Sequence, residues 1–81
     1  MSREQVFEKL NEIFRDVFDD ESITVGEETT AKDVEGWDSL ANINLIVSME
    51  GEFDIKFTMN EITGLKNVGE IADVIMERAQ G

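Results

Sequence analysis

DSLANINLIVSMEGEF, residues 38–53, combines a helix-start residue with an uninterrupted run of residues that suit a helix. Asp38 fits the N-cap position, because its carboxylate can accept a hydrogen bond from a backbone N–H group of the first turn. The residues after it include no Pro and a single Gly, Gly51, close to the end. We therefore predict a helix over residues 39–53.

This predicted helix has two apolar faces. At 100° per residue, one arc can face the interior of a helical bundle. It consists of Leu45, Ile46, Met49 and Phe53. Leu40, Ile43 and Val47 lie on a second arc, and polar residues separate the two. Because a small bundle buries one face of a surface helix, the second arc should be exposed and contact a partner. The alternative, that the preceding loop covers it, stays open at this point.

Three capping-box patterns predict the remaining helices. The pairs are Ser2 with Gln5, Thr58 with Glu61, and Asn67 with Glu70. They predict a helix from about residue 3 to about residue 18, a short segment near residues 59–64, and a last helix ending at about residue 79. The last helix should face the core with an apolar stripe. That stripe is Val68, Ile71, Ala72, Val74, Ile75 and Ala79.

The segments between these helices lack a regular period. Residues 19–37 should form a long loop, with room for a short helical turn, and apolar side chains should pin it. Those side chains are Ile23, Val25, Val34 and Trp37. Residues 53–57 alternate like a strand but have no partner strand, so we expect an extended linker. The predicted fold is an all-α four-helix bundle with three principal helices, one short helix and a long first loop, in a single domain over residues 1–81.

Composition limits the kinds of function that are open to this chain. Seven Lys and Arg against nineteen Asp and Glu give a net charge of −12, which disfavours nucleic acid and anionic membranes and favours basic protein surfaces. No apolar run could span a bilayer, and the first residues lack the apolar core of a signal peptide, so we expect a cytoplasmic protein. Without Cys and His there is no disulfide, no Ser-His-Asp triad and no tetrahedral zinc site. We expect no metal site and no catalytic residue, so any chemistry should belong to an added group.

Ser39 stands in the first turn of the central predicted helix. Unpaired backbone N–H groups and the positive end of the helix dipole favour a phosphate at such a position. For an isolated Asp-Ser-Leu, however, an ordinary helix-start serine is the commoner explanation. The tripeptide alone therefore does not establish a modified serine.

A longer pattern gives the serine a specific meaning. GWDSL at residues 36–40, followed by Ile43, Leu45 and MEGEF at residues 49–53, resembles the signature of acyl carrier proteins, and the resemblance extends over nearly the whole chain. It implies that a dedicated transferase uses Mg²⁺ to move 4'-phosphopantetheine from coenzyme A to Ser39. The arm's thiol would carry acyl groups as thioesters between enzymes of fatty acid biosynthesis, or of related specialised lipid or polyketide biosynthesis. The carrier itself would be a non-catalytic monomer.

The resemblance also implies roles for residues around Ser39. In the family, some positions dock basic surfaces of the transferase and of acyl-loading ligases, synthases or transferases. These positions correspond to Asp38, Leu40, Ile43, Val47, Glu50 and Glu52. Positions that line a cavity for the acyl chain correspond to Leu45, Met49, Phe53, Leu65 and Ile71. The acidic positions should mainly steer the encounter. The cavity positions can equally be plain core.

Some residues depart from carriers of primary fatty acid synthesis. Ala41, Asn42 and Asn44 are neutral where such carriers are more acidic, and Trp37 is bulkier than the usual residue. These differences suggest a specialised carrier with its own ligase or synthase. Two alternatives stay open: an aminoacyl or peptidyl carrier, and an acidic helical interaction module without a prosthetic group.

Overall fold

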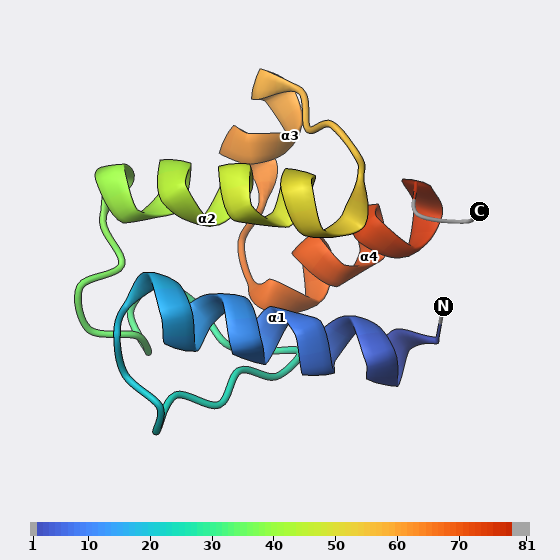
Figure 1. The fold of residues 1–81 in the computed structure, drawn as a ribbon. Coiled ribbons are helices and arrows are strands. Elements are labelled where there is room, and N and C mark those ends of the chain that lie inside the picture. The colour runs from blue at the N-terminus through green and yellow to red at the C-terminus, as the bar shows by residue number, and fades with distance from the viewer. Residues whose placement is uncertain (1, 79–81) are drawn as a thin grey trace.

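The computed structural model describes residues 2–78, which form four helices and no strand. The helices are α1 (Arg3–Val17), α2 (Ser39–Phe53), α3 (Met59–Gly64) and α4 (Val68–Arg78). α1 and α2 lie side by side and run in opposite directions, α4 packs against α1, and the short α3 lies beyond α2 (Figure 1). The predicted set of three principal helices and one short helix is confirmed. Ala79, expected on the last apolar stripe, lies outside the described residues.

Side chains at the helix starts explain why the boundaries follow the sequence so closely. Ser2 Oγ accepts a hydrogen bond from the Gln5 N–H at 3.2 Å, and Gln5 Oε1 accepts one from the Ser2 N–H at 2.9 Å. Thr58 and Glu61 make the same reciprocal pair at the start of α3. These bonds satisfy N–H groups that have no partner inside the helix. Two of the predicted capping boxes are thus present in full.

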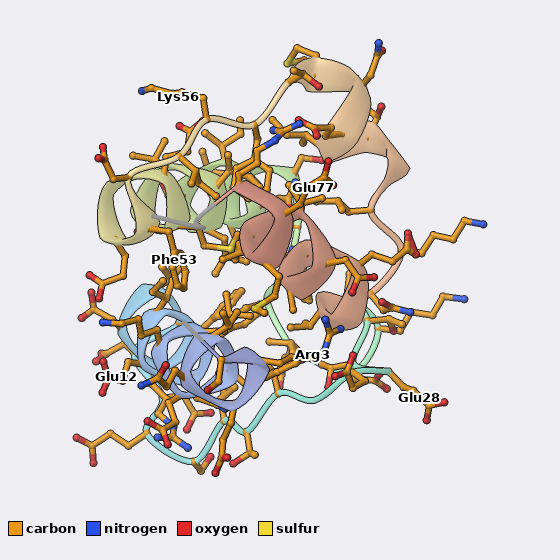
Figure 2. All side chains as sticks on the ribbon, turned by 90° about the vertical axis from the view of Figure 1, so that its right-hand side faces the viewer. Arg3, Glu12, Glu28, Phe53, Lys56 and Glu77 are labelled. Atoms are coloured by element: carbon orange, nitrogen blue, oxygen red, sulfur yellow. The ribbon has the colours of Figure 1, made fainter. Side chains whose placement is uncertain are left out.

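The core lies between α1, α2 and α4, and the linker after α2 closes it. The predicted inner arc of α2 is buried, and Phe53 lies between α1 and α2 (Figure 2). Ile55 and Phe57 follow it into the core from the non-helical linker after α2, whereas Phe53, predicted to begin that linker, is the last residue of the helix. The buried residues of the core cluster are Val6, Leu10, Ile13, Phe14, Val25, Leu45, Ile46, Met49, Phe53, Ile55, Phe57, Val68, Ile71, Ala72 and Ile75.

The long loop between α1 and α2 is held against α1. Arg15 Nε donates to the Ile23 carbonyl at 2.7 Å, and the Val25 N–H donates to Asn11 Oδ1 at 2.7 Å. Val25 and Val34 are buried, as expected of residues that pin the loop. Residues 18–38 contain turns but no helix, so the short helical turn for which the sequence left room is not formed.

The same loop is hydrogen-bonded to the start of α4. The Gly69 N–H donates to the Glu27 carbonyl at 2.9 Å, and the Val68 N–H donates to the Thr29 carbonyl at 2.8 Å. Arg3 adds side-chain bonds to Glu27 and Asp73 and reaches the Gly69 carbonyl. Its guanidinium group holds the pKa of the Glu27 carboxyl below the ordinary value. The beginning of α1, the loop and α4 therefore meet at one junction.

Replacing Gly69 by alanine should destabilise this junction. A Cβ atom there would lie 2.5 Å from the Glu27 carbonyl oxygen, a backbone atom that is itself bonded to the Gly69 N–H. The overpacking should lower the free energy of unfolding by about 1–3 kcal/mol, measured by urea denaturation. Gly51→Ala is the matched control, because nothing lies within 4 Å of its Cβ position. It should raise stability by roughly 0.5–1 kcal/mol as a helix substitution. Equal effects of the two changes would contradict the close packing at Gly69.

Candidate functional site

The Ser39 hydroxyl is presented at the amino end of α2, where the residue is exposed. Asp38 caps the helix: its Oδ1 accepts from the Ala41 N–H at 2.8 Å, and its carbonyl accepts from the Asn42 N–H at 2.8 Å. Within the described part of the chain, the N–H groups of Ser39 and Leu40 have no hydrogen-bond partner. An oxyanion attached to this serine would therefore meet free donors and the positive end of the helix dipole.

The residues before Ser39 fix the start of α2 to the core. Gly36 has φ +89°, a left-handed conformation that other residues rarely adopt, and its carbonyl accepts from the Asp38 N–H at 2.9 Å. Trp37 packs edge-on against Phe14, with ring centroids 5.2 Å apart. Its Nε1 donates to Asn42 Oδ1 at 3.1 Å, which ties the indole to the first turn of α2. Sequence analysis identified Trp37 as a loop anchor but missed this link to Asn42.

The second apolar arc of α2 is exposed. Leu40, Ile43 and Val47 have relative exposures of 70%, 59% and 62%. The preceding loop runs along α1 instead of covering them, which decides between the two possibilities that the sequence left open. Met59 at the start of α3, with 74% exposure, is a further exposed apolar residue that sequence analysis did not identify.

The three acidic candidates have different surroundings. Asp38 caps α2 directly before Ser39. Glu50 is half-buried, and its Oε2 accepts from the Phe57 N–H at 2.9 Å, so it supports the linker after α2. Glu52 Oε1 lies 2.8 Å from Lys9 Nζ and faces α1. Glu50 and Glu52 thus have partners within the chain, and Asp38 alone of the three adjoins the serine.

A cavity of about 360 Å³ opens beside Ser39. Its lining residues are Ala31, Trp37, Asp38, Ser39, Asn42, Ile62, Leu65, Lys66, Asn67 and Ile71. Leu65 and Ile71 are therefore the two predicted pocket residues that line it. The other three, Leu45, Met49 and Phe53, are buried in the core and do not line this cavity. Lys66 is a lining residue for which the sequence gave no signal, because its proximity to Ser39 depends on how the α3–α4 linker packs.

These features fit a phosphopantetheine group. The chain offers an exposed hydroxyl for attachment, free N–H donors for the phosphate and an adjoining cavity of the size that small-molecule sites usually have. Among residues 2–78 no cluster of carboxylates could hold a metal ion. No helix in the same range is both long and apolar enough to cross a membrane.

Comparison with known proteins agrees with the site. The family profile described as "Phosphopantetheine attachment site" matches residues 8–75. The acyl carrier protein of Clostridium perfringens is 31% identical over 75 residues, which cover 93% of this chain and 99% of that protein. The acyl carrier protein of Thermotoga maritima is 30% identical over 77 residues, or 95% of each chain.

A solved structure shows the same fold. The solution structure of the holo acyl carrier protein from Geobacter metallireducens superposes with a TM-score of 0.84 and 49% sequence identity, over 89% of this chain and 83% of that one. The all-α fold of acyl-carrier type is thereby confirmed. The matches also favour a carrier over an interaction module without a prosthetic group. The chain belongs to the acyl carrier protein family, whose members are non-catalytic, bear a phosphopantetheine attachment site and interact with a phosphopantetheinyl transferase and with acyl-handling enzymes.

Proposed function

We propose that Ser39 is the attachment residue and that this protein delivers acyl groups as thioesters from one enzyme to the next. The observation that carries the proposal is the exposed Ser39 hydroxyl at the capped amino end of α2. The arm supplies a terminal thiol, which the chain itself lacks because it contains no Cys. The protein's part is to present the hydroxyl, to stabilise the phosphate and to dock enzymes.

The surface around Ser39 suits enzyme docking. Leu40, Ile43 and Val47 form an exposed apolar stripe on the helix that Ser39 begins. A partner that covers this stripe removes apolar area from water with its active site close to the serine. Asp38, Glu50 and Glu52 add negative charge to the same helix, and the net charge of −12 attracts basic enzyme surfaces. We propose these six residues as the contacts for the transferase and for acyl-loading ligases, synthases or transferases.

The neutral first half of α2 supports a specialised carrier. Ala41, Asn42 and Asn44 leave no negative side chain between Asp38 and Glu50. Electrostatic attraction to enzymes that expect an acidic helix should be correspondingly weaker. We propose a monomeric, single-domain carrier that serves its own enzymes in fatty acid or related lipid or polyketide biosynthesis. A cytoplasmic location agrees with its membership of this family.

Transfer of the arm in vitro tests the proposal. The purified protein is incubated with coenzyme A, Mg²⁺ and a broad-specificity phosphopantetheinyl transferase, and its intact mass is measured. Oγ of Ser39 gives up its proton to the surrounding solution and forms a bond to phosphorus, while the adjoining pyrophosphate bond breaks and the nucleotide part of coenzyme A leaves with its phosphates. The mass should rise by one phosphopantetheine group. A folded sample that stays unmodified beside a modified reference carrier would contradict the proposal.

Val47→Glu should weaken docking without unfolding the protein. Val47 is 62% exposed, so stability should change by no more than about 0.5 kcal/mol. In a complex, the new carboxylate would lie in the apolar contact, and the KM of the transferase for the carrier should rise about tenfold. Thr24→Glu adds the same charge at an exposed loop position beside α1 and should leave KM unchanged. An equal rise for both variants would contradict the proposed stripe, because net charge alone would then explain the effect.

A further inference from the structure

The start of α2 is built differently from the starts of α1 and α3. Each of those two helices begins with a capping box, in which the third helical residue, Gln5 or Glu61, accepts from the backbone N–H of the N-cap residue. In α2 that third position is Ala41, whose methyl group can accept nothing, and the Asp38 N–H donates to the Gly36 carbonyl instead. One of the two reciprocal bonds that hold the starts of α1 and α3 is therefore missing at α2.

A hydrogen bond between Trp37 and Asn42 takes its place. These residues stand directly before the N-cap and at the fourth helical position. At this pair of positions many helices have two apolar side chains, which pack together and fix the angle at which the chain enters the helix. Here Trp37 Nε1 donates to Asn42 Oδ1 at 3.1 Å, and both residues are half-buried. The pair thus forms a polar staple across the first turn of α2.

The polar staple connects this first turn to the core. The ring of Trp37 packs edge-on against Phe14, which is completely buried in α1. One rigid indole therefore contacts the core with its ring and holds Asn42 with its N–H group. Ser39 lies between the two stapled residues in the sequence, and it lines the same cavity as both. A shift of the first turn would move Ser39 relative to Val47, which stands two turns further along the helix.

We propose that Trp37 and Asn42 are positioning residues for the transfer of the arm, and that their staple holds Ser39 at a fixed place relative to the docking stripe of α2. The inference rests on the proposed attachment at Ser39. Without the staple, the first turn frays, because only its bonds to Asp38 still hold it. A transferase then docks on Val47 as before but meets a displaced hydroxyl, and a small displacement of a reacting group lowers the rate strongly.

Asn42→Ala removes the acceptor of the staple and leaves the indole in place. Because alanine favours the helix, the melting temperature should change little. The kcat of the transferase should fall by roughly threefold to tenfold, as expected for the loss of one hydrogen bond, and its KM for the carrier should not change. Asn44→Ala is the matched control. It removes the same amide from an exposed position on α2 and should leave both constants unchanged.

Trp37→Phe tests the same bond from its other end. Phenylalanine can still pack against Phe14 but has no N–H group to donate. This variant should lose kcat as Asn42→Ala does. The double variant should lose no more than either single variant, because both changes remove one shared bond. Losses that multiply in the double variant would show two independent effects and overturn the inference.

The indole N–H group gives a direct readout of the staple in solution. Trp37 is the only tryptophan of the chain, so its Nε1 proton is the one indole signal in a ¹H–¹⁵N spectrum. In Asn42→Ala this proton should move upfield and exchange faster with solvent, and in Asn44→Ala it should stay in place. An unmoved signal in Asn42→Ala would show that the bond is absent in solution and would overturn the inference.

The outcomes separate this inference from the proposed function. If Asn42→Ala loses the bond but accepts the arm at the wild-type kcat, the positioning role is refuted and attachment at Ser39 stays intact. A raised KM in place of a lowered kcat would make the pair a docking contact, which also refutes the positioning role. A folded wild-type protein that gains no mass would refute the attachment and the positioning role together.

Discussion

Ser39→Ala is expected to fold like the wild-type protein and to gain no mass when it is incubated with coenzyme A, Mg²⁺ and a phosphopantetheinyl transferase. The change removes the only hydroxyl group in the first turn of α2, so the loss should be complete. Because Ser39 is exposed and Asp38 supplies the cap, the free energy of unfolding should change by no more than about 0.5 kcal/mol. Intact-mass spectrometry and a thermal melt measure the two effects.

Ser48→Ala is the matched control for this prediction. It removes a hydroxyl from the same helix, nine positions further along the chain. This variant should accept the arm as the wild-type protein does. If Ser39→Ala still gains the arm, or if Ser48→Ala fails to gain it, attachment depends on another residue.

Phe14→Ala should cause the largest loss of stability that we expect from a single side chain, about 3–5 kcal/mol. Phe14 is completely buried, stacks on Phe18 at 6.0 Å between ring centroids, and supports Trp37 edge-on. An 81-residue protein of average stability has roughly 4–12 kcal/mol in total. At the low end of that range the variant should be partly unfolded even without denaturant, and the packing of Trp37 beside Ser39 should loosen. Urea denaturation followed by circular dichroism measures the change.

Leu40→Ala provides the comparison for Phe14→Ala. It also truncates a large apolar side chain, but one that is 70% exposed, so its cost should be no more than about 0.5 kcal/mol. If Phe14→Ala costs no more than Leu40→Ala, the position of Phe14 at the centre of the core is contradicted.

The helices could be predicted because their boundaries depend on local contacts. Each capping box makes hydrogen bonds between side chains and backbone groups only three residues apart, as in the pairs Ser2 with Gln5 and Thr58 with Glu61. Asp38 does the same at α2. Such contacts follow from the order of residues alone, as does the angle between the two apolar arcs of α2. Helix number, type and limits were therefore within reach of the sequence.

The path of the long loop could not be predicted, because contacts between distant residues determine it. The bond between Val25 and Asn11 holds the loop against α1, and the bonds to Glu27 and Thr29 tie it to the start of α4. Whether that loop covered Leu40, Ile43 and Val47 was therefore decided only by the structure.

The same limit applies to the cavity. The sequence identified Ser39 and, through the family resemblance, five pocket positions, of which Leu65 and Ile71 line the space beside the serine. Lys66 had no local signal, because an exposed lysine between two helices looks like ordinary surface. Its place in the lining of this cavity follows only from the packing of the α3–α4 linker against the start of α2.

The position of the arm in protein isolated from its native cells is the most direct measure of the central claim. Trypsin cleavage after Lys32 and Lys56 gives a peptide of residues 33–56, which contains both Ser39 and Ser48, so fragmentation of this peptide must place the added mass. We predict phosphopantetheine on Ser39. An arm on Ser48 or in another peptide, or a folded protein that carries no arm in the cell, would contradict the account.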